Sequence, residues 1–126
     1  MDNSKKYKIL LVEDDESLSN VYVTRFEAEG FDIRRVGNGE DALATAINYQ
    51  PDIILLDIMM PKVDGFDVLD ILKNTNKTKD LKIIMLSALS QEMDIDKAKK
   101  LGADDYLIKS EVTIADVVEK IKKELN

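Results

Sequence analysis

Five apolar runs, set apart by longer segments of mixed polarity, constrain most strongly what this chain can fold into. The runs are residues 9–12, a weaker one at 33–36, then 53–56, 83–86 and 106–108. Continuous apolar runs of this length are typical of strands that are buried on both faces of a sheet. The sequence therefore predicts five strands at these places.

The segments between the runs carry apolar residues at the spacing of helices that lay one face on a sheet. Three such stripes are Leu18, Val21, Tyr22 and Phe26; Ala42, Leu43, Ala46 and Ile47; and Phe66, Leu69 and Leu72. Residues 91–101 carry only a broken stripe, so a helix there is the least strongly indicated. Thr113 and Asp116 resemble a capping box, which predicts that the last helix begins near Thr113.

Strand and helix alternate along the whole chain, and neither an internal repeat nor a domain boundary interrupts them. Alternation of this kind predicts a doubly wound α/β fold, with a five-stranded parallel sheet, right-handed crossovers and helices on both faces. A chain of 126 residues fits one domain. We therefore expect a single domain spanning residues 1–126.

The composition excludes several classes of function. The chain has no cysteine and no histidine, which excludes disulfides, zinc sites and Ser/His or Cys/His catalysis. Its net charge of -7 disfavours direct binding to nucleic acid or to an anionic membrane. No apolar run is long enough for a membrane span or a signal peptide, so the expected location is the cytoplasm.

Four of the five apolar runs end directly in polar side chains, namely Glu13 with Asp14, Asp57, Ser87 and Lys109. Taken singly, each has an ordinary structural explanation, such as a helix cap, a turn or a solvated surface charge. In an open α/β sheet, however, the carboxyl ends of the strands form one crevice in which ligands bind. We therefore expect these side chains to converge on one site.

Three carboxylates in one crevice require a cation. Two carboxylates about 5 Å apart repel by roughly 3 kcal/mol at an effective dielectric constant of about 20, so Glu13, Asp14 and Asp57 together cost on the order of 10 kcal/mol. Lys109 supplies one positive charge, whereas a divalent ion supplies two. Oxygen ligands that leave positions for water and phosphate favour Mg²⁺ over Ca²⁺, and Mn²⁺ should substitute.

The same side chains are those that phosphoryl transfer to a carboxylate requires. Asp57 is a nucleophile that needs no general base, because a carboxylate attacks unaided. A metal would offset the developing charge, while Lys109 and Ser87 would hold the phosphoryl oxygens.

Four ordered motifs resemble the receiver domain of bacterial two-component response regulators, over essentially the whole chain. They are LLVEDD at residues 10–15, LLDIMMP at 55–61 with Asp64 and Gly65, MLSA at 85–88 and GADDYLIK at 102–109. The resemblance implies the flavodoxin-like strand order 2-1-3-4-5. It also implies a phosphorylation-dependent signalling switch rather than an enzyme, a phosphoacceptor that assists its own phosphotransfer and dephosphorylation.

The resemblance also implies the roles of the acidic residues. Asp57 would accept the phosphoryl group. Asp14, Asp57 and the backbone carbonyl of Met59 would bind Mg²⁺, and Glu13 would act at or beside the metal. The phosphoryl group would come from a sensor histidine kinase or a histidine phosphotransfer protein. A downstream effector protein or domain would read the result, and we expect a monomer or a phosphorylation-dependent dimer.

Lys109, Ser87 and Tyr106 would carry the signal in this resemblance. Lys109 would pair with the phosphoryl oxygens, and Ser87 would hydrogen-bond the phosphoryl group once it is attached. Tyr106 has two interpretations, a core aromatic or a switch whose ring changes rotamer when Ser87 moves, and we favour the switch. The output surface would then lie around Ser87 and Tyr106.

One residue departs from the family's pattern. Receivers usually have proline after the site lysine, often with a cis bond, whereas this chain has Ser110. A cis bond before a non-proline residue costs about 3 kcal/mol. We therefore expect this loop to be either strained or trans, with Glu111 near the mouth of the site and atypical phosphorylation kinetics.

Three other functions fit parts of the pattern. A phosphorylation-independent interaction module on the same scaffold would normally lack Asp57, the acidic pair or Lys109. A phosphatase of the haloacid dehalogenase type needs a second acid two residues after the nucleophile, where this chain has Met59. A flavodoxin needs a loop rich in Ser, Thr and Gly after the first strand, and here that loop is acidic.

Overall fold

The computed structural model of the protein describes residues 6–126, in which strands and helices alternate. The strands are β1 (Lys8–Val12), β2 (Asp32–Val36), β3 (Ile53–Leu56), β4 (Lys82–Ser87) and β5 (Asp105–Ile108). The helices are α1 (Glu16–Ala28), α2 (Gly39–Tyr49), α3 (Gly65–Lys73), α4 (Glu92–Lys100) and α5 (Ile114–Leu125), with a 3-10 turn, η1 (Lys109–Glu111). Each predicted strand is found where an apolar run predicted it.

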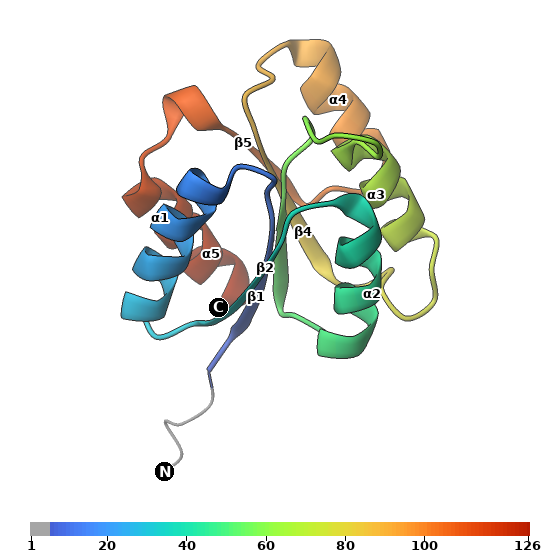
Figure 1. The fold of residues 1–126 in the computed structure, drawn as a ribbon. Helices are drawn as coiled ribbons and strands as arrows, with labels where there is room; N and C mark the ends of the chain where they lie inside the picture. The colour runs from blue at the N-terminus through green and yellow to red at the C-terminus, as the bar shows by residue number, and fades with distance from the viewer. Residues whose placement is uncertain (1–5) are drawn as a thin grey trace.

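The five strands form one parallel sheet in the order β2-β1-β3-β4-β5 (Figure 1). The predicted doubly wound α/β fold and its strand order are thus confirmed. Strand β1 lies between β2 and β3, so the carboxyl ends of β1 and β3 are direct neighbours. A ligand crevice is expected where the strand order reverses, which is at these two strands.

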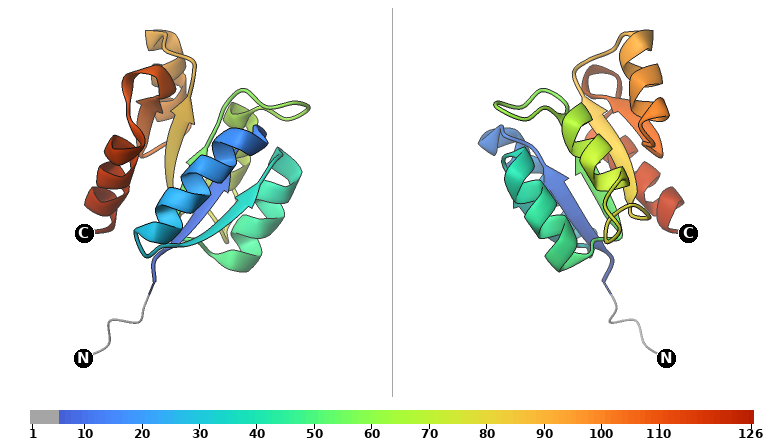
Figure 2. Two further views of the ribbon diagram at one scale, coloured as in Figure 1. Left: turned by 60° about the vertical axis from the view of Figure 1, so that its left-hand side comes forward. Right: turned by 90° about the vertical axis from the view of Figure 1, so that its right-hand side faces the viewer.

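Alternate residues of each inner strand pack on opposite faces of the sheet. In β1, Ile9 and Leu11 pack with buried residues of α1 and α5, while Leu10 and Val12 pack with those of α2, α3 and α4. Figure 2 shows the sheet between these two sets of helices. Burial on both faces explains why the inner strands are continuous apolar runs rather than alternating ones.

The helix stripes are confirmed with one exception. Helix α1 buries Ser19, Tyr22 and Phe26, whereas Val21, which the predicted stripe includes, is 57% exposed. The buried positions follow the i, i+3, i+7 spacing, and this places Val21 on the solvent side of the helix. Apolar character alone therefore misplaced one residue.

The two helices at the C-terminal end also follow the prediction. Helix α5 begins at Ile114 behind the expected capping box, in which Thr113 accepts from the backbone N–H of Asp116 and Asp116 accepts from that of Thr113. Helix α4 buries only Ala98, in keeping with its broken stripe. Within residues 6–126 no helix is long and apolar enough to cross a membrane.

Candidate functional site

The loop after β1 places Glu13 inside and Asp14 outside. The backbone N–H of Glu13 donates to the carbonyl of Val36 at 3.0 Å, which extends the pairing of β1 with β2 by one residue. Asp15 caps α1 by accepting from the backbone N–H of Leu18 at 2.9 Å. Since Asp15 is the cap, the Asp14 carboxylate is left exposed and available to a ligand.

Asp57 follows β3 and lies beside this loop. Its backbone N–H donates to the carbonyl of Val12 at 3.0 Å, so the ends of β1 and β3 are held together. The carboxylate oxygens of Glu13, Asp14 and Asp57 offer ligand atoms within 4.8 Å of one another. The structure thus brings together the three carboxylates that the sequence predicted to converge.

Lys109, at the end of β5, reaches into this cluster. Its Nζ lies 2.5 Å from Oε1 of Glu13 and 3.5 Å from Oδ2 of Asp57. The Lys109 side chain is only 21% exposed, so it is not a solvated surface charge. One positive charge therefore faces three carboxylates, and the site keeps a net negative charge that favours a cation.

The carboxylate oxygens of Glu13 and Asp57 already accept hydrogen bonds from different donors. Glu13 accepts from Lys109 at Oε1 and from the backbone N–H of Asp15 at Oε2, 3.1 Å away. Asp57 accepts from the backbone N–H of Met59 at Oδ1, 3.3 Å away. The all-oxygen donor set fits a hard divalent cation such as Mg²⁺. Each of the three carboxylates offers one oxygen that could hold it.

Burial sets the protonation behaviour of Asp57. Burial and, as the second cause, the negative charge of Glu13 together raise the pKa of Asp57 to about 6, while Lys109 opposes both effects. Burial by itself would lower the pKa of Lys109, but the hydrogen bond to Glu13 and the charge of Asp57 raise it. Lys109 therefore stays charged at neutral pH, while Asp57 is the group of the cluster whose charged form is disfavoured.

Gly65 allows α3 to start directly against the backbone of Asp57. A Cβ atom at this position would lie 2.2 Å from the carbonyl oxygen of Asp57 and 2.6 Å from Cα of Ile58. The backbone N–H of Gly65 donates to the carbonyl of Ile58 at 2.8 Å. Asp64 caps the same helix by accepting from the backbone N–H of Asp67. The backbone of Asp57 is thus held between β1 and α3.

Ser87 and Tyr106 meet at one backbone position next to the acidic cluster. Ser87 is buried at the end of β4, and its hydroxyl accepts from the backbone N–H of Leu89 at 3.2 Å. The Tyr106 hydroxyl donates to the carbonyl of the same Leu89 at 2.8 Å. Ser87 does not cap α4, whose first turn follows Gln91 without a side-chain cap. The two predicted switch residues are therefore joined through the loop between β4 and α4.

Comparison with known proteins places this site in a family. Residues 9–122 match the family model of the response regulator receiver domain. The chain belongs to this family. Receiver domains of response regulators serve phosphorylation-dependent signalling in two-component systems, so the flavodoxin and dehalogenase alternatives no longer apply.

Relatives of this receiver domain include a much longer regulator. RpaA of Synechocystis sp., a DNA-binding dual master transcriptional regulator, is 40% identical over 102 residues, which cover 81% of this chain and 42% of RpaA. The chain thus spans less than half the length of this relative.

Two solved structures are close in fold. A CheY-like receiver domain protein of Methanospirillum hungatei superposes with a TM-score of 0.88 at 26% identity, covering 96% of this chain and 94% of that chain. The BeF3-activated N-terminal receiver domain of Klebsiella pneumoniae RstA gives a TM-score of 0.87 at 26% identity, covering 94% of this chain and 98% of that one. Both agree with the confirmed strand order.

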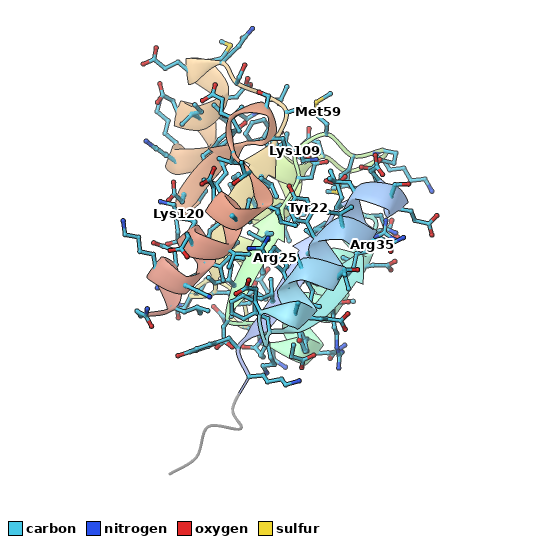
Figure 3. The ribbon with its side chains drawn as sticks, turned by 90° about the vertical axis from the view of Figure 1, so that its left-hand side faces the viewer. Tyr22, Arg25, Arg35, Met59, Lys109 and Lys120 are labelled. Carbon is cyan, nitrogen blue, oxygen red and sulfur yellow. The ribbon has the colours of Figure 1, made fainter. Side chains whose placement is uncertain are left out.

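In this receiver domain the loop after Lys109 has a trans peptide bond, which is one of the two alternatives predicted for it. No peptide bond within residues 6–126 is cis, and the bond between Lys109 and Ser110 is therefore trans. The chain forms the 3-10 turn η1 here, in which Ser110 and Glu111 are exposed. Met59 is also exposed, at 57%, and Figure 3 shows its side chain at the same end of the molecule as Lys109.

Two residues of the site were not predicted from the sequence. Arg35 on β2 donates from Nε to the carbonyl of Glu13 at 3.0 Å and from Nη2 to that of Asp14 at 3.2 Å. Ser19 on α1 is buried and donates to the Glu13 carbonyl at 3.4 Å. The one available signal was the arginine pair in the weakest apolar run, where a buried strand would have apolar residues.

Proposed function

We propose that Asp57 accepts a phosphoryl group, in a reaction that depends on Mg²⁺, from a phosphorylated histidine of a sensor histidine kinase or a histidine phosphotransfer protein. The observation that carries the proposal is the convergence of Asp57 with two further carboxylates within 4.8 Å and with Lys109 at 3.5 Å. A buried carboxylate beside one lysine and an all-oxygen cation site has the groups that phosphoryl transfer needs.

The chemical step is nucleophilic attack by a carboxylate oxygen of Asp57 on phosphorus. An O–P bond forms as the P–N bond of the phosphohistidine breaks, and the electron pair of that bond goes to the imidazole nitrogen. Lys109 lies where it can neutralise a phosphoryl oxygen, because its Nζ is already 3.5 Å from Asp57. No general base takes part, since Asp57 with a pKa of about 6 is largely ionised at neutral pH.

Mg²⁺ would be held by Asp14, Asp57 and the backbone carbonyl of Met59, with Glu13 beside it. When bound, it supplies two positive charges that offset those of the carboxylates and of the phosphoryl oxygens. Mn²⁺, which also prefers oxygen ligands, should replace it.

The domain is best described as a phosphoacceptor rather than an enzyme with a separate substrate. It would assist its own phosphorylation through Lys109 and the metal site. The same groups would also assist hydrolysis of the acyl phosphate, because they stabilise charge on the same phosphoryl oxygens.

The signal would leave the site through Ser87 and Tyr106. Phosphorylation adds roughly 1.5 to 2 negative charges at Asp57. The Ser87 hydroxyl would turn from the Leu89 N–H toward the phosphoryl group, and the loop that also binds Tyr106 would move with it. An effector protein or domain would read this surface.

The acidic chain itself would not contact nucleic acid or membrane, and it would act as a monomer or as a phosphorylation-dependent dimer.

The proposal is tested by intact-mass measurement after incubation with Mg²⁺ and acetyl phosphate, a small acyl phosphate donor. The mass should rise by one phosphoryl group in an acid-stable, hydroxylamine-labile form, and chelation of Mg²⁺ should prevent it. Asp57→Asn should stay unmodified. If wild type gains no such group, the domain is a phosphorylation-independent interaction module instead. If Asp57→Asn gains it as readily as wild type, Asp57 is not the acceptor.

A further inference from the structure

Arg34 and Arg35 are neighbours in the edge strand β2 but serve opposite faces of the sheet. Arg34 is in register with Leu10, and its guanidinium lies 4.2 Å from the ring centroid of Tyr49 on α2. Arg35 is in register with Leu11, on the face that α1 covers. Figure 3 shows Arg35 beside α1, on the side away from α5. One arginine therefore packs on a helix, and the other reaches the acidic loop.

The guanidinium of Arg35 binds two consecutive backbone carbonyls in that loop. Nε donates to Glu13 at 3.0 Å and Nη2 donates to Asp14 at 3.2 Å. The Glu13 carbonyl also accepts from the buried Ser19 hydroxyl of α1, at 3.4 Å. The loop is thus held from β2 and from α1 at the two residues whose carboxylates belong to the proposed metal site.

We propose that Arg35 is a positioning residue of the metal site, which fixes the backbone of Glu13 and Asp14 so that their carboxylates face Asp57. This inference rests on the proposed function, because it assigns a role toward the same metal. Fixing two neighbouring carbonyls restricts the dihedral angles between them, and these angles direct the Asp14 side chain. Asp14 needs this support most, since its own carboxylate is exposed.

The role depends on the shape of the guanidinium rather than on its charge. A planar fork can donate to two acceptors with a fixed separation, whereas an ammonium group is a compact point charge. The positive charge of Arg35 by itself repels a divalent cation, so a purely electrostatic role would weaken metal binding. Groups that hydrogen-bond to metal ligands without touching the metal typically contribute roughly 10 to 100-fold to metal affinity.

Gly37 gives an independent way to disturb the same contact. A Cβ atom there would lie 3.3 Å from Nη2 of Arg35 and 3.6 Å from its Cζ, so alanine would push the guanidinium aside. The backbone of Gly37 does not have a positive φ, because within residues 6–126 only Gly30 and Gly102 are glycines of that kind. Gly37→Ala therefore alters the position of Arg35 while it leaves the charge unchanged.

The test compares Arg35→Lys with the matched control Arg34→Lys by calorimetric titration with Mg²⁺. Both variants keep the net charge. We expect Arg35→Lys to raise the dissociation constant about tenfold and Arg34→Lys to leave it unchanged. In acetyl phosphate assays, Arg35→Lys should need more Mg²⁺ for half-maximal phosphorylation but reach the same maximal level. A merely structural role would instead lower the maximal level through unfolding.

Gly37→Ala completes the test. It should weaken Mg²⁺ binding by less than Arg35→Lys does, and it should have no further effect in an Arg35→Met background. Wild-type affinity in Arg35→Lys, or an equal effect of Gly37→Ala in both backgrounds, contradicts the role of Arg35. If wild type itself shows no saturable Mg²⁺ binding, the proposed metal site is wrong and the role of Arg35 is lost with it.

Discussion

Lys109 and Glu13 form a partly buried ion pair, with Nζ of the lysine 2.5 Å from Oε1 of the glutamate; the glutamate side chain is 3% exposed and that of the lysine 21%. The pair joins the ends of β5 and β1, which are separated in the sheet by β3 and β4. Lys109 is also 3.5 Å from Asp57, so it is shared between two carboxylates. Its removal would leave both of them buried without a cation.

Lys109→Met should therefore destabilise the metal-free domain strongly. Breaking a buried pair by removing one partner costs about 3–5 kcal/mol, because the remaining charge is uncompensated. The free energy of unfolding, measured with urea in the presence of a chelator, should fall by this amount. Mg²⁺ should restore part of it, whereas phosphorylation of Asp57 should be lost.

Lys120→Met is the matched control for this variant. Lys120 on α5 pairs with Asp105 at 2.7 Å, but both side chains are about a third exposed. A pair in contact with solvent contributes about 0–1 kcal/mol. Similar losses in the two variants would show that the burial of Glu13 and Asp57 adds nothing to the cost of removing the lysine.

Asp57→Asn should become more stable than wild type as the pH rises, when no metal is bound. Burial, with the charge of Glu13, raises the pKa of Asp57 from 3.8 to about 6 against the opposing effect of Lys109. A raised pKa in the folded state stabilises the fold below the ordinary value, and this contribution is lost as the pH rises through about 6. The variant has no such titration.

The difference in unfolding free energy between Asp57→Asn and wild type should therefore grow by roughly 1–2 kcal/mol from about pH 5 to about pH 7. Urea titrations of both proteins with a chelator measure it, and Mg²⁺ should reduce the growth by neutralising the cluster. A difference that stays constant over this range would mean that the pKa of Asp57 is not raised in the folded state.

The convergence of the site could be predicted because it follows from topology. Parallel strands end at one edge of the sheet, so a polar residue directly after an apolar run must lie near the others, as Glu13, Asp57, Ser87 and Lys109 do. The strand order followed from the family resemblance, since alternation alone fits other orders. Local signals also sufficed for the cap of α5, where Thr113 and its partner are three residues apart.

Contacts between distant side chains and backbone could not be predicted. Arg35 binds carbonyls 21 and 22 residues earlier, and neither periodicity nor spacing records such a contact. The exposure of Val21 was missed because Val21 was counted in the stripe for its apolar side chain alone, and the helix turns that side chain toward solvent. The division of Lys109 between Glu13 and Asp57 depends on distances that strand positions do not determine.

Gly65→Ala should destabilise the domain because no room exists for a Cβ atom. The atom would lie 2.2 Å from the Asp57 carbonyl oxygen, and the obstructing atoms are backbone rather than flexible side chain. Inserting a methyl group into a packed site costs about 1–3 kcal/mol. Urea unfolding should show this loss, and the displaced backbone of Asp57 should also slow phosphorylation by acetyl phosphate.

Gly37→Ala serves as the control for Gly65→Ala, since its nearest neighbours are the end of the Arg35 side chain at 3.3 Å. It should leave the free energy of unfolding nearly unchanged. If Gly65→Ala were equally harmless, α3 would be free to shift away from β3, and the close approach at Asp57 would not matter.

Tyr106→Phe should separate acceptance of the phosphoryl group from transmission of the signal. The hydroxyl of Tyr106 binds the Leu89 carbonyl rather than a carboxylate of the site, so Mg²⁺ affinity and phosphorylation of Asp57 should be unchanged. Loss of this hydrogen bond should cost about 1 kcal/mol of stability. The amide NMR shifts of residues 88–90 on phosphorylation should become smaller, because the loop is no longer tied to the ring.

Tyr49→Phe controls for the loss of a tyrosine hydroxyl as such. Tyr49 on α2 donates to the carbonyl of Asp32 at 3.0 Å, at the start of β2 and thus at the opposite end of the sheet from the site. This variant should lose similar stability and keep the full response of residues 88–90. If both variants keep that response, the hydroxyl of Tyr106 transmits nothing and the ring is a core aromatic, the alternative that the sequence left open.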